Sequence, residues 1–597
     1  MQPLQKLTLL LLLSCCTPIV SAQTYLNLDF ETMSGNQIRR WTIRNNAAVY
    51  TIDSVEKVSG NYSYKISKIN PNEKRDAFFV NILPPELVKG KNIILKGRIK
   101  TEIKEKAEAG LFLVAYDKTG KPIQHDEMTG KRIDHTSSWQ EVCISAKIDS
   151  NAAIVSIGGA CYGGELTAWF DNFELFIDGK KYLSPVPRTA ALSKNELAVL
   201  KKYCYPLKSF DPNIETYTDL SILKQLTKDA RIISLGESSH GSSEIFKMKH
   251  RIIKYLAQQE KFNILAFEAN MPESAEVNKA ILKKQFDQIN LIEKLHLWPW
   301  HTAEVRNLLN WVQDYNQGQP KIEFAGFDMQ NYNQAMETLK QALKSNVDIQ
   351  KDLYEFEYFL STIAYQYVYE KGKVSLTDEQ IHRIAELNTS LKTMIQKSNS
   401  NATDKDWLIQ NLRIIEQYLD QKIGVGNREE KRDRHMAENI LWLSAHRPDS
   451  KIIAWAHNGH VSKSHINLDK SFLDSPRGMG SYIADVIPCK SLAIGFTFYE
   501  GSYTAMDPND IKPFPAETAF LGTYEHFLNQ MDEPIFILDL KKIKADKPVE
   551  LDWLLSTLPF RTIGGNKQTV EFRDTNIADA FDYLIFIKTS TNSHLLD

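Results

Sequence analysis

The sequence predicts a protein of several domains: an N-terminal all-β jelly-roll sandwich, followed by an α/β domain with a mostly parallel sheet and a helical insertion. Three observations support this prediction. The chain has 597 residues, and one domain usually takes roughly 100–200. Short alternating apolar runs fill the first part, and continuous apolar strands separated by helical stretches fill the rest. The content of 43% hydrophobic and 24% charged residues is ordinary for a globular protein, which excludes global disorder.

The charges of the chain are balanced, with 72 Lys and Arg residues against 74 Asp and Glu residues. A near-neutral chain gives no electrostatic reason to expect nucleic acid or an anionic membrane as a partner. No apolar run reaches the length of about 18 residues that marks a transmembrane helix. We therefore expect neither a nucleic-acid partner nor a transmembrane segment.

Residues 1–22 predict a signal peptide, with one Lys, a Leu-rich stretch, and small or aliphatic residues before a cleavage point after Ala22. The mature protein would then be secreted or periplasmic. Residues 12–15 offer an alternative, because they resemble a lipoprotein processing site that would leave the protein lipid-anchored through Cys15. We expect Cys143, Cys161, Cys204 and Cys489 to be buried free thiols, with a disulfide between Cys143 and Cys161 as the alternative.

Residues 23–183 predict the β-sandwich. Alternating apolar runs recur there between turn signals, at residues 77–80, 93–99, 111–116 and 153–157. Short strands at this spacing are typical of a sandwich or jelly roll.

Both ends of this first domain carry acidic and aromatic residues, at 27–31 near the start and at 168–175 in the expected last strand. These stretches resemble the opening and closing strands of jelly-roll carbohydrate-binding modules. The resemblance implies a structural calcium ion, for which Glu31 and Asp171 are the candidate ligands through their oxygen atoms. Ordinary polar residues at strand ends are the alternative explanation.

Residues 184–187 predict a linker, and residues 184–597 predict the α/β domain. Short apolar strands separated by helical stretches are expected at residues 231–235, 263–267, 322–327, 452–455, 492–496, 534–538 and 583–587. Such strands with helical crossovers indicate a mostly parallel sheet that is covered on both faces. Residues about 330–447 are helical and polar on one face, which predicts a helical insertion over the sheet.

Acidic residues and histidines follow five of the expected strands. In open α/β sheets the ligand lies at the carboxyl ends of the strands. The residues just past those ends are Glu237 and His240, then Glu268, Asp328, His457 and His460, and Glu500. Convergence of these side chains at one edge of the sheet predicts a functional site there.

The first of these loops, residues 236–241, leads directly into an amphipathic helix, whose free N–H groups suit an anion or an oxyanion. The chain contains no GxSxG elbow, HExxH motif, P-loop or Gly-rich dinucleotide fingerprint. Without a marked Ser or Cys nucleophile, an activated water molecule is the natural attacking group, and a neutral histidine held by a carboxylate can accept its proton.

Five motifs together resemble the erythromycin esterase family over roughly residues 215–590. They read GESSHG at 236–241, FE at 267–268, GFDMQ at 326–330, RDRHMAEN at 432–439 and WAHNGHV at 455–461. Members of that family hydrolyse the lactone ester of macrolides, or act on unknown substrates, with a histidine-activated water and no required metal.

The resemblance implies that His240 is the general base and that the Glu237 carboxylate holds its ring in place. His457, His460 and Glu268 would complete the catalytic site. The residues expected to bind substrate are Lys249, Arg251, Asp328, Glu304, Arg434 and Glu500. Lys249 departs from the family, which more often has an arginine there, and a lysine lacks the planar guanidinium fork.

These observations predict a secreted hydrolase of an ester or lactone that needs no cofactor for catalysis. A macrolide, an acylated glycan and a lipid ester all stay open as substrates. One alternative is a metal-dependent hydrolase that uses the same His/Glu cluster. The other is a non-enzymatic surface protein that binds a glycan or another ligand. We also expect residues 23–183 to fold independently and residues 184–597 to stay catalytically competent without them.

Overall fold

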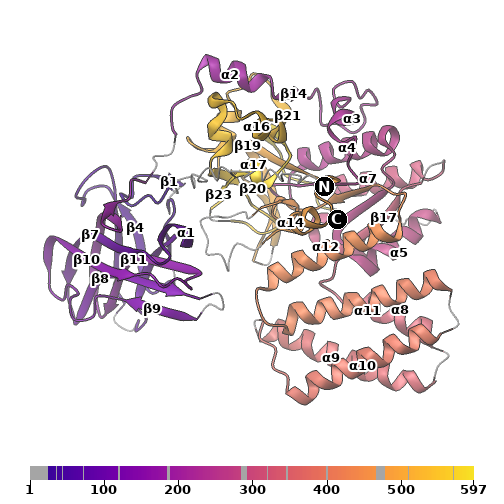
Figure 1. The fold of residues 1–597 in the computed structure, drawn as a ribbon, viewed down its shortest axis with the longest axis horizontal. Coiled ribbons are helices and arrows are strands. Elements are labelled where there is room, and N and C mark those ends of the chain that lie inside the picture. Colours follow the sequence, from indigo (N-terminus) through magenta and orange to yellow (C-terminus); the bar gives the residue numbers. More distant parts are fainter. Residues whose placement is uncertain are drawn as a thin grey trace, which may run out of the picture.

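The computed structural model describes residues 25–596, except for 35–36, 44, 71–72, 118–120, 185–187, 284–291, 319–320, 345–346, 371, 399–400, 465–476, 509 and 569. The predicted signal peptide at 1–22, the lipid-anchor site at Cys15 and most of the predicted linker at 184–187 therefore lie outside the described residues. The described chain forms an all-β part and an α/β part, as the sequence predicts (Figure 1).

The N-terminal part consists of two antiparallel sheets that pack face to face. One sheet has the order β10-β7-β12-β5-β4, and the other has the order β3-β6-β11-β8-β9. Their bounds are β3 (Thr42–Ile43), β4 (Val49–Asp53), β5 (Ser63–Lys68), β6 (Ala77–Leu83), β7 (Asn92–Ile103), β8 (Ala107–Tyr116), β9 (Pro122–Asp126), β10 (Ser137–Lys147), β11 (Ile154–Gly163) and β12 (Leu166–Ile177), with β13 (Lys180–Lys181) beside β12. Alternate residues of both sheets and a group of aromatic rings that includes Phe30, Trp41 and Phe79 fill the core.

Residues 27–31 form a tight turn and not the strand that the carbohydrate-module resemblance suggests. Asn27 and Phe30 have φ angles of 50° and 61°, which a strand does not allow. The Asn27 side chain stabilises the turn, because it accepts the N–H of Thr32 at 3.0 Å and donates to the Thr32 carbonyl at 2.9 Å. The first strands are the short pair β1 (Met33–Ser34) and β2 (Gln37–Ile38).

The α/β part is built on one sheet with the strand order β14-β21-β24-β19-β15-β18-β16-β17. The strands are β14 (Cys204–Pro206), β15 (Ile232–Leu235), β16 (Ile264–Asn270), β17 (Glu323–Asp328), β18 (Ile452–Trp455), β19 (Ser491–Asp507), β21 (Ile535–Asp539) and β24 (Tyr583–Ser590). Every pair from β24 to β17 is parallel, and β21 and β14 add antiparallel pairs at one edge. Each of the seven strands that the sequence predicts is present, and β19 continues past its predicted end to pair with β20 (Asp510–Pro515).

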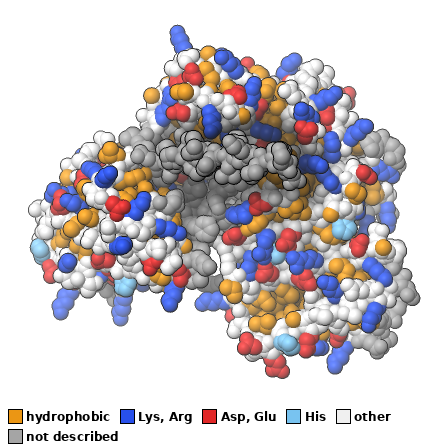
Figure 2. All heavy atoms as spheres, in the orientation of Figure 1, with side chains coloured by type: hydrophobic (Ala, Val, Ile, Leu, Met, Phe, Trp, Pro, Cys, Tyr) orange, Lys and Arg blue, Asp and Glu red, His pale blue; other side chains and the backbone are white. Residues whose placement is uncertain are grey.

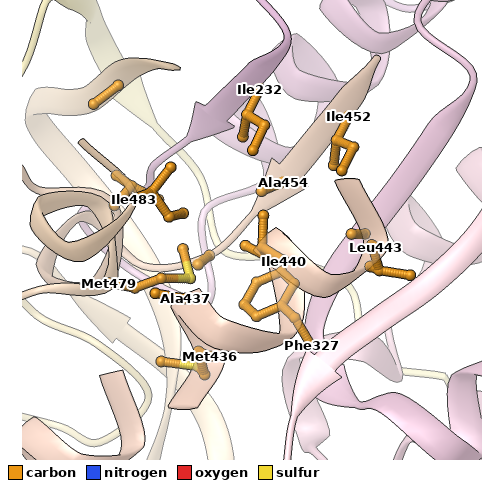
Figure 3. Close-up of a cluster of buried hydrophobic side chains, with 14 of the residues drawn as sticks. Ile232, Phe327, Met436, Ala437, Ile440, Leu443, Ile452, Ala454, Met479 and Ile483 are labelled. Carbon is orange, nitrogen blue, oxygen red and sulfur yellow. The ribbon is translucent and has the colours of Figure 1, made fainter. Parts of the chain in front are cut away.

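Helices cover both faces of this sheet. One face packs against α4 (Ser243–Glu260), α5 (Met271–Leu282) and α7 (Ala303–Tyr315). The other packs against α12 (Arg428–His446) and α14 (Met479–Val486), where Met436 and Ile440 of α12 lie over Ile452 and Ala454 of the sheet (Figure 3). This packing directs the first turns of α12 toward the carboxyl ends of the strands.

Four helices precede α12 between β17 and β18: α8 (Asn333–Leu343), α9 (Val347–Tyr369), α10 (Asp378–Lys397) and α11 (Ala402–Ile423). They form the layered group at the lower right of Figure 1, in the region of the predicted insertion. The remaining short elements are α1 (Pro85–Val88), α2 (Lys194–Lys201), α3 (Ile222–Leu226), α13 (Asn458–Val461), α15 (Tyr524–Leu528), α16 (Leu540–Asp546), α17 (Ile577–Ala580), β22 (Leu558–Arg561) and β23 (Phe572–Thr575).

Three sequence expectations about the surface and the thiols can be compared with the described residues. None of the helices described is long and apolar enough to cross a membrane. Cys143, Cys161, Cys204 and Cys489 are all free thiols, as predicted, but only Cys161 and Cys204 are buried, whereas Cys143 and Cys489 are exposed. Basic and acidic side chains intermix over the face shown in Figure 2, which agrees with the balanced composition.

Candidate active site

Four of the predicted strand ends bring their polar side chains together at the carboxyl edge of the sheet. The rings of His240 and His457 lie 5.2 Å apart, and those of His457 and His460 lie 6.5 Å apart. Glu268 reaches this group through the backbone N–H of His457, at 3.0 Å. All five residues predicted to be catalytic, with Glu237 as the fifth, therefore belong to one cluster.

The loop after β15 packs too closely against its neighbours for side chains at its two glycines. A Cβ atom at Gly236 would lie 2.2 Å from the Asn458 side-chain oxygen, and one at Gly241 would lie 1.9 Å from the Thr504 carbonyl oxygen. Ser242 then caps helix α4 by accepting the N–H of Ile245. This close packing holds the residues between the two glycines in one place.

Glu237 and His240 form a tightly held pair. Glu237 is fully buried, and its Oε1 lies 2.6 Å from Nδ1 of His240. Its Oε2 accepts hydrogen bonds from Lys249 at 2.6 Å and from Trp455 at 2.8 Å. Because a carboxylate only accepts, Nδ1 of His240 carries a proton, and in the neutral form of the ring Nε2 keeps its lone pair. The pair therefore presents a proton acceptor.

Lys249 supports Glu237 and does not face a substrate. Its side chain is fully buried, and its ammonium lies over the Trp455 ring, 4.4 Å from the centroid. Burial lowers the pKa of Lys249 to about 8, against the opposing effect of the Glu237 carboxylate. The predicted substrate-binding role is therefore replaced by a supporting one. A lysine suits this position, because a single carboxylate oxygen needs a point charge and not a planar fork.

Arg432 stands at the centre of a second group of charges. Its guanidinium donates to Glu268 at 2.7 Å and to the fully buried Asp328 at 2.6 Å. Burial lowers the pKa of Arg432, but the carboxylates of Asp328 and Glu268 have the larger effect, so the pKa lies well above the ordinary value. Burial also raises the pKa of Glu268, and the positive charges of His460 and Arg432 reverse that effect, so that its pKa lies well below 4.5.

His460 is held between two carboxylates. Its Nδ1 lies 2.8 Å from Asp433 and its Nε2 lies 3.2 Å from Glu268, with Nη1 of Arg432 at 3.1 Å. Burial lowers its pKa, but the carboxylates of Asp433 and Glu268 more than offset this and raise the pKa to about 10. The ring is therefore protonated at neutral pH. It acts as a fixed cation and cannot accept a proton there.

His457 has the opposite character. Its Nδ1 accepts the N–H of Gly459 at 3.1 Å, which places the ring proton on Nε2. Burial holds its pKa well below 6.5, and positive charge on the neighbouring rings lowers it further, against the weaker opposing effects of Glu268 and the Ser238 carbonyl. Its Nε2 is buried and has no hydrogen-bond partner within ordinary geometry among the described residues. A neutral N–H beside a base, with only a weak contact to the Ser238 carbonyl, suits an oxyanion.

Most of the other residues predicted to bind substrate lie outside the cluster. Arg251 binds Asp219 through two hydrogen bonds of 2.7 and 2.8 Å. Glu304 binds His594 and Ser243. Arg434 is half-exposed on α12 and pairs with Asp420, and Glu500 makes no described bond to the cluster. Of that set, only Asp328 and the supporting Lys249 join it.

Sequence reasoning missed Arg432 and Asp433, although both stand in the RDRHMAEN motif. The helical period could have found them. They lie four residues before Met436 and Ala437, which face the sheet, so all four share one face of α12. Arg434 points away from that face.

The predicted calcium ligands meet at one loop, but their oxygens are already engaged. Glu31 accepts N–H bonds from Asn61 and Tyr62, and Asp171 accepts them from Val58, Ser59 and Asn172. A calcium ion needs the lone pairs at which these N–H groups point. These bonds occupy most of the lone pairs that a calcium ion would use, and the calcium site stays a prediction. In the described part of the chain, no group of three or more His, Cys, Asp or Glu residues is arranged to hold a metal ion.

The charge of His460 predicts a pH-dependent stability. Its folded pKa of about 10 lies above the ordinary value of about 6.5. The stability it contributes is thus fully present below pH 6.5 and is lost as the pH rises through 10. We expect the wild type to have a larger free energy of unfolding than His460→Asn. Between pH 6.5 and 10 this difference should shrink by about 1 kcal/mol for each pH unit. Urea unfolding of both proteins over that range measures it. A difference that does not change with pH would contradict the assignment.

Comparisons with known proteins agree with this architecture. The erythromycin esterase family model matches residues 257–590. YbfO of Bacillus subtilis is 26% identical over 375 residues, which are 58% of this chain and 82% of YbfO. Erythromycin esterase type II of Escherichia coli is 25% identical over 333 residues, or 51% of this chain and 77% of that enzyme.

Solved structures give the same picture for the fold. A Bacillus cereus protein superposes with a TM-score of 0.58 and 26% identity, covering 68% of this chain and 99% of its own. A mutant of the erythromycin esterase EreC in its open conformation has a TM-score of 0.51 at 17% identity, covering 65% of this chain and 98% of its own, which supports the fold alone.

Proposed function

The chain belongs to the erythromycin esterase family, a family of hydrolases, and we propose that it cleaves an ester or lactone bond with a water molecule activated by His240. The observation that carries the proposal is the Glu237–His240 pair, which turns Nε2 of His240 away from the carboxylate and places its ring 5.2 Å, centre to centre, from the ring of His457. A base and a separate N–H donor at that spacing match the two needs of ester hydrolysis.

The reaction balances with these two histidines. Nε2 of His240 takes a proton from water while the water oxygen attacks the carbonyl carbon, and Glu237 stabilises the resulting imidazolium. The carbonyl oxygen becomes an oxyanion and accepts the Nε2–H of His457. The carbon–oxygen bond then breaks, and the leaving alkoxide takes the proton back from His240. The products are a carboxylic acid and an alcohol.

The second charge group keeps His457 in position. Glu268 accepts the backbone N–H of His457, and Arg432 holds Glu268 in turn. Because His460 carries a fixed positive charge beside them, it favours the neutral form of His457. We assign Glu268, Arg432 and His460 to this supporting role and not to proton transfer.

The substrate is proposed only as a class: a small-molecule ester or lactone, or an acylated glycan. The erythromycin esterases among the relatives favour a lactone. The N-terminal segment favours export, so that the enzyme meets its substrate in the periplasm or outside the cell, or at a membrane if Cys15 is lipidated. Activity screening of the mature protein against macrolide lactones and acylated sugars tests the proposal. If the protein hydrolysed none of the macrolide lactones and none of the acylated sugars, the proposal would be contradicted.

Removal of metal ions separates this mechanism from the metal-dependent alternative. In the structure, the carboxylate oxygens of Glu237 and the ring nitrogens of His460 are engaged with neighbours inside the cluster. We therefore expect exhaustive chelation to leave turnover unchanged on any substrate found. The measurement is activity and metal content before and after chelation. A stoichiometric metal whose occupancy tracks activity, with recovery on adding Mn²⁺, Co²⁺ or Zn²⁺, would favour the alternative.

A further inference from the structure

The hairpin of β22 and β23 contacts both the β-sandwich and the loop that carries His240. Its two strands pair in antiparallel register from Leu558↔Thr575 to Arg561↔Phe572. The segment between the strands reaches the catalytic loop, and the base of the hairpin reaches the sandwich. Among the described residues, the pairs of Asp574 with Arg39 and Arg40 are the only ion pairs that join the sandwich, residues 25–183, to the α/β part.

The segment after β22 holds the catalytic loop by its backbone. The N–H of Ile563 donates to the Ser238 carbonyl at 2.8 Å, and the N–H of His240 donates to the Gly564 carbonyl at 3.2 Å. The His240 ring also lies against the next residue, because a Cβ atom at Gly565 would be 3.3 Å from its Cδ2. The backbone position of His240 therefore depends on where this segment lies.

The base of the hairpin carries a buried carboxylate whose described ion-pair partners are on the sandwich. Asp574 of β23 is only 5% exposed. It pairs with Arg39, and Nη1 of Arg40 lies 3.5 Å from it. Aromatic and apolar side chains of both parts, among them Trp41 and Phe572, line a small cavity beside the pair. A buried charge needs such a partner, because loss of one member leaves the other uncompensated.

A buried arginine makes the hairpin one unit. Arg561 is fully buried between the rings of Phe498 and Phe572, and it pairs with Glu571 across the hairpin. Its guanidinium also donates to the backbone carbonyl of Phe498 at 2.9 Å. If Asp574 moves, the two strands of the hairpin should therefore move together, and so should the segment that binds the catalytic loop.

We propose that the β-sandwich is a positioning part of the catalytic unit, in which Arg39 and Arg40 fix Asp574 and so hold the hairpin against the loop of His240. This differs from the expectation that residues 184–597 act alone. The inference relies on the proposed function for the role of His240, so its main test measures the loop and not turnover.

The test compares two Asp→Asn variants of the full chain. Asp574→Asn removes the charge that meets the sandwich. Asp579→Asn is the matched control, because Asp579 lies on the neighbouring α17 and pairs with the exposed Lys544. We expect amide hydrogen exchange at His240 and Ile563 to become at least about tenfold faster in Asp574→Asn, with Ile453 of the sheet core and the control unchanged. With a substrate in hand, kcat should fall while KM stays the same.

A second variant keeps the test decisive if Asp574→Asn does not fold. Arg39→Met removes the same pair from the sandwich side and should speed exchange at the same two amides, whereas Arg39→Lys, which keeps the charge, should restore most of the protection. Unchanged exchange at His240 and Ile563 in folded Asp574→Asn or Arg39→Met would overturn the proposal. A chain that hydrolyses no ester but shows the faster exchange would instead overturn only the proposed function.

Discussion

Replacement of His240 by alanine is expected to lower turnover by a factor of about 10²–10⁴, the usual contribution of a general base. The fold should survive the change. Among the described residues, the one hydrogen-bond partner of the His240 side chain is Glu237, and that carboxylate keeps its hydrogen bonds from Lys249 and Trp455. The loss would therefore fall on proton transfer and not on packing.

Steady-state kinetics on a confirmed substrate, together with urea unfolding, measures both parts of this expectation. His382→Ala is a suitable control, since that histidine is 78% exposed on α10 and lies far along the chain from the cluster. Near-wild-type turnover in His240→Ala would remove His240 from the mechanism. A parallel loss of stability would mean that the residue is structural.

The sheet and its strand ends could be predicted because the information is local. Buried parallel strands are continuous apolar runs, and polar residues just past such runs must lie at one edge. The four segments predicted to end at Leu235, Phe267, Phe327 and Trp455 indicated the cluster in this way, although β16 and β17 continue to Asn270 and Asp328. The turn at residues 27–31 was misjudged because an acidic and aromatic composition does not reveal a side chain that bonds its own backbone.

The different roles of the three histidines could not be predicted, since residue type alone assigns them one ordinary pKa. His460 is protonated because Asp433 and Glu268 flank it, whereas His457 is neutral because it is buried beside other cationic groups, and the N–H of Gly459 fixes its tautomer. The pair between Arg39 and Asp574 was equally hidden: 535 positions separate them, and no local pattern links charges at that range.

Replacement of Glu237 by glutamine should be nearly as damaging to turnover as loss of His240, with a loss of about 10²–10⁴. Glutamine keeps the shape, but its amide oxygen remains with the donors Lys249 and Trp455, and its NH₂ group then faces Nδ1 of His240. An N–H donor there forces the ring proton onto Nε2. His240 would be present in the wrong tautomer and could not accept a proton from water.

The same variant should lose stability in a pH-dependent manner, through Lys249. The folded pKa of Lys249, about 8, lies below the ordinary value of 10.5. Between pH 8 and pH 10.5 the unfolded chain therefore binds more protons than the folded chain. Folding becomes more favourable as the pH rises through this range. At pH 7 the ammonium is charged, and Glu237→Gln removes the carboxylate that compensates it, at a cost of about 3–5 kcal/mol. Near pH 10 the amine is neutral, so the difference between the two proteins should shrink.

Urea unfolding at both pH values and nitrogen NMR of the histidine rings measure stability and tautomer separately. Glu438→Gln is the control for the substitution itself, because Glu438 also faces the Nδ1 of a histidine, His435, at 3.0 Å but lies outside the cluster on α12. If Glu237→Gln kept the proton of His240 on Nδ1 and still lost turnover, the tautomer explanation would be wrong. If its stability deficit were as large near pH 10 as at pH 7, the charge on Lys249 would not be what Glu237 compensates, and the pair would be held together by packing alone.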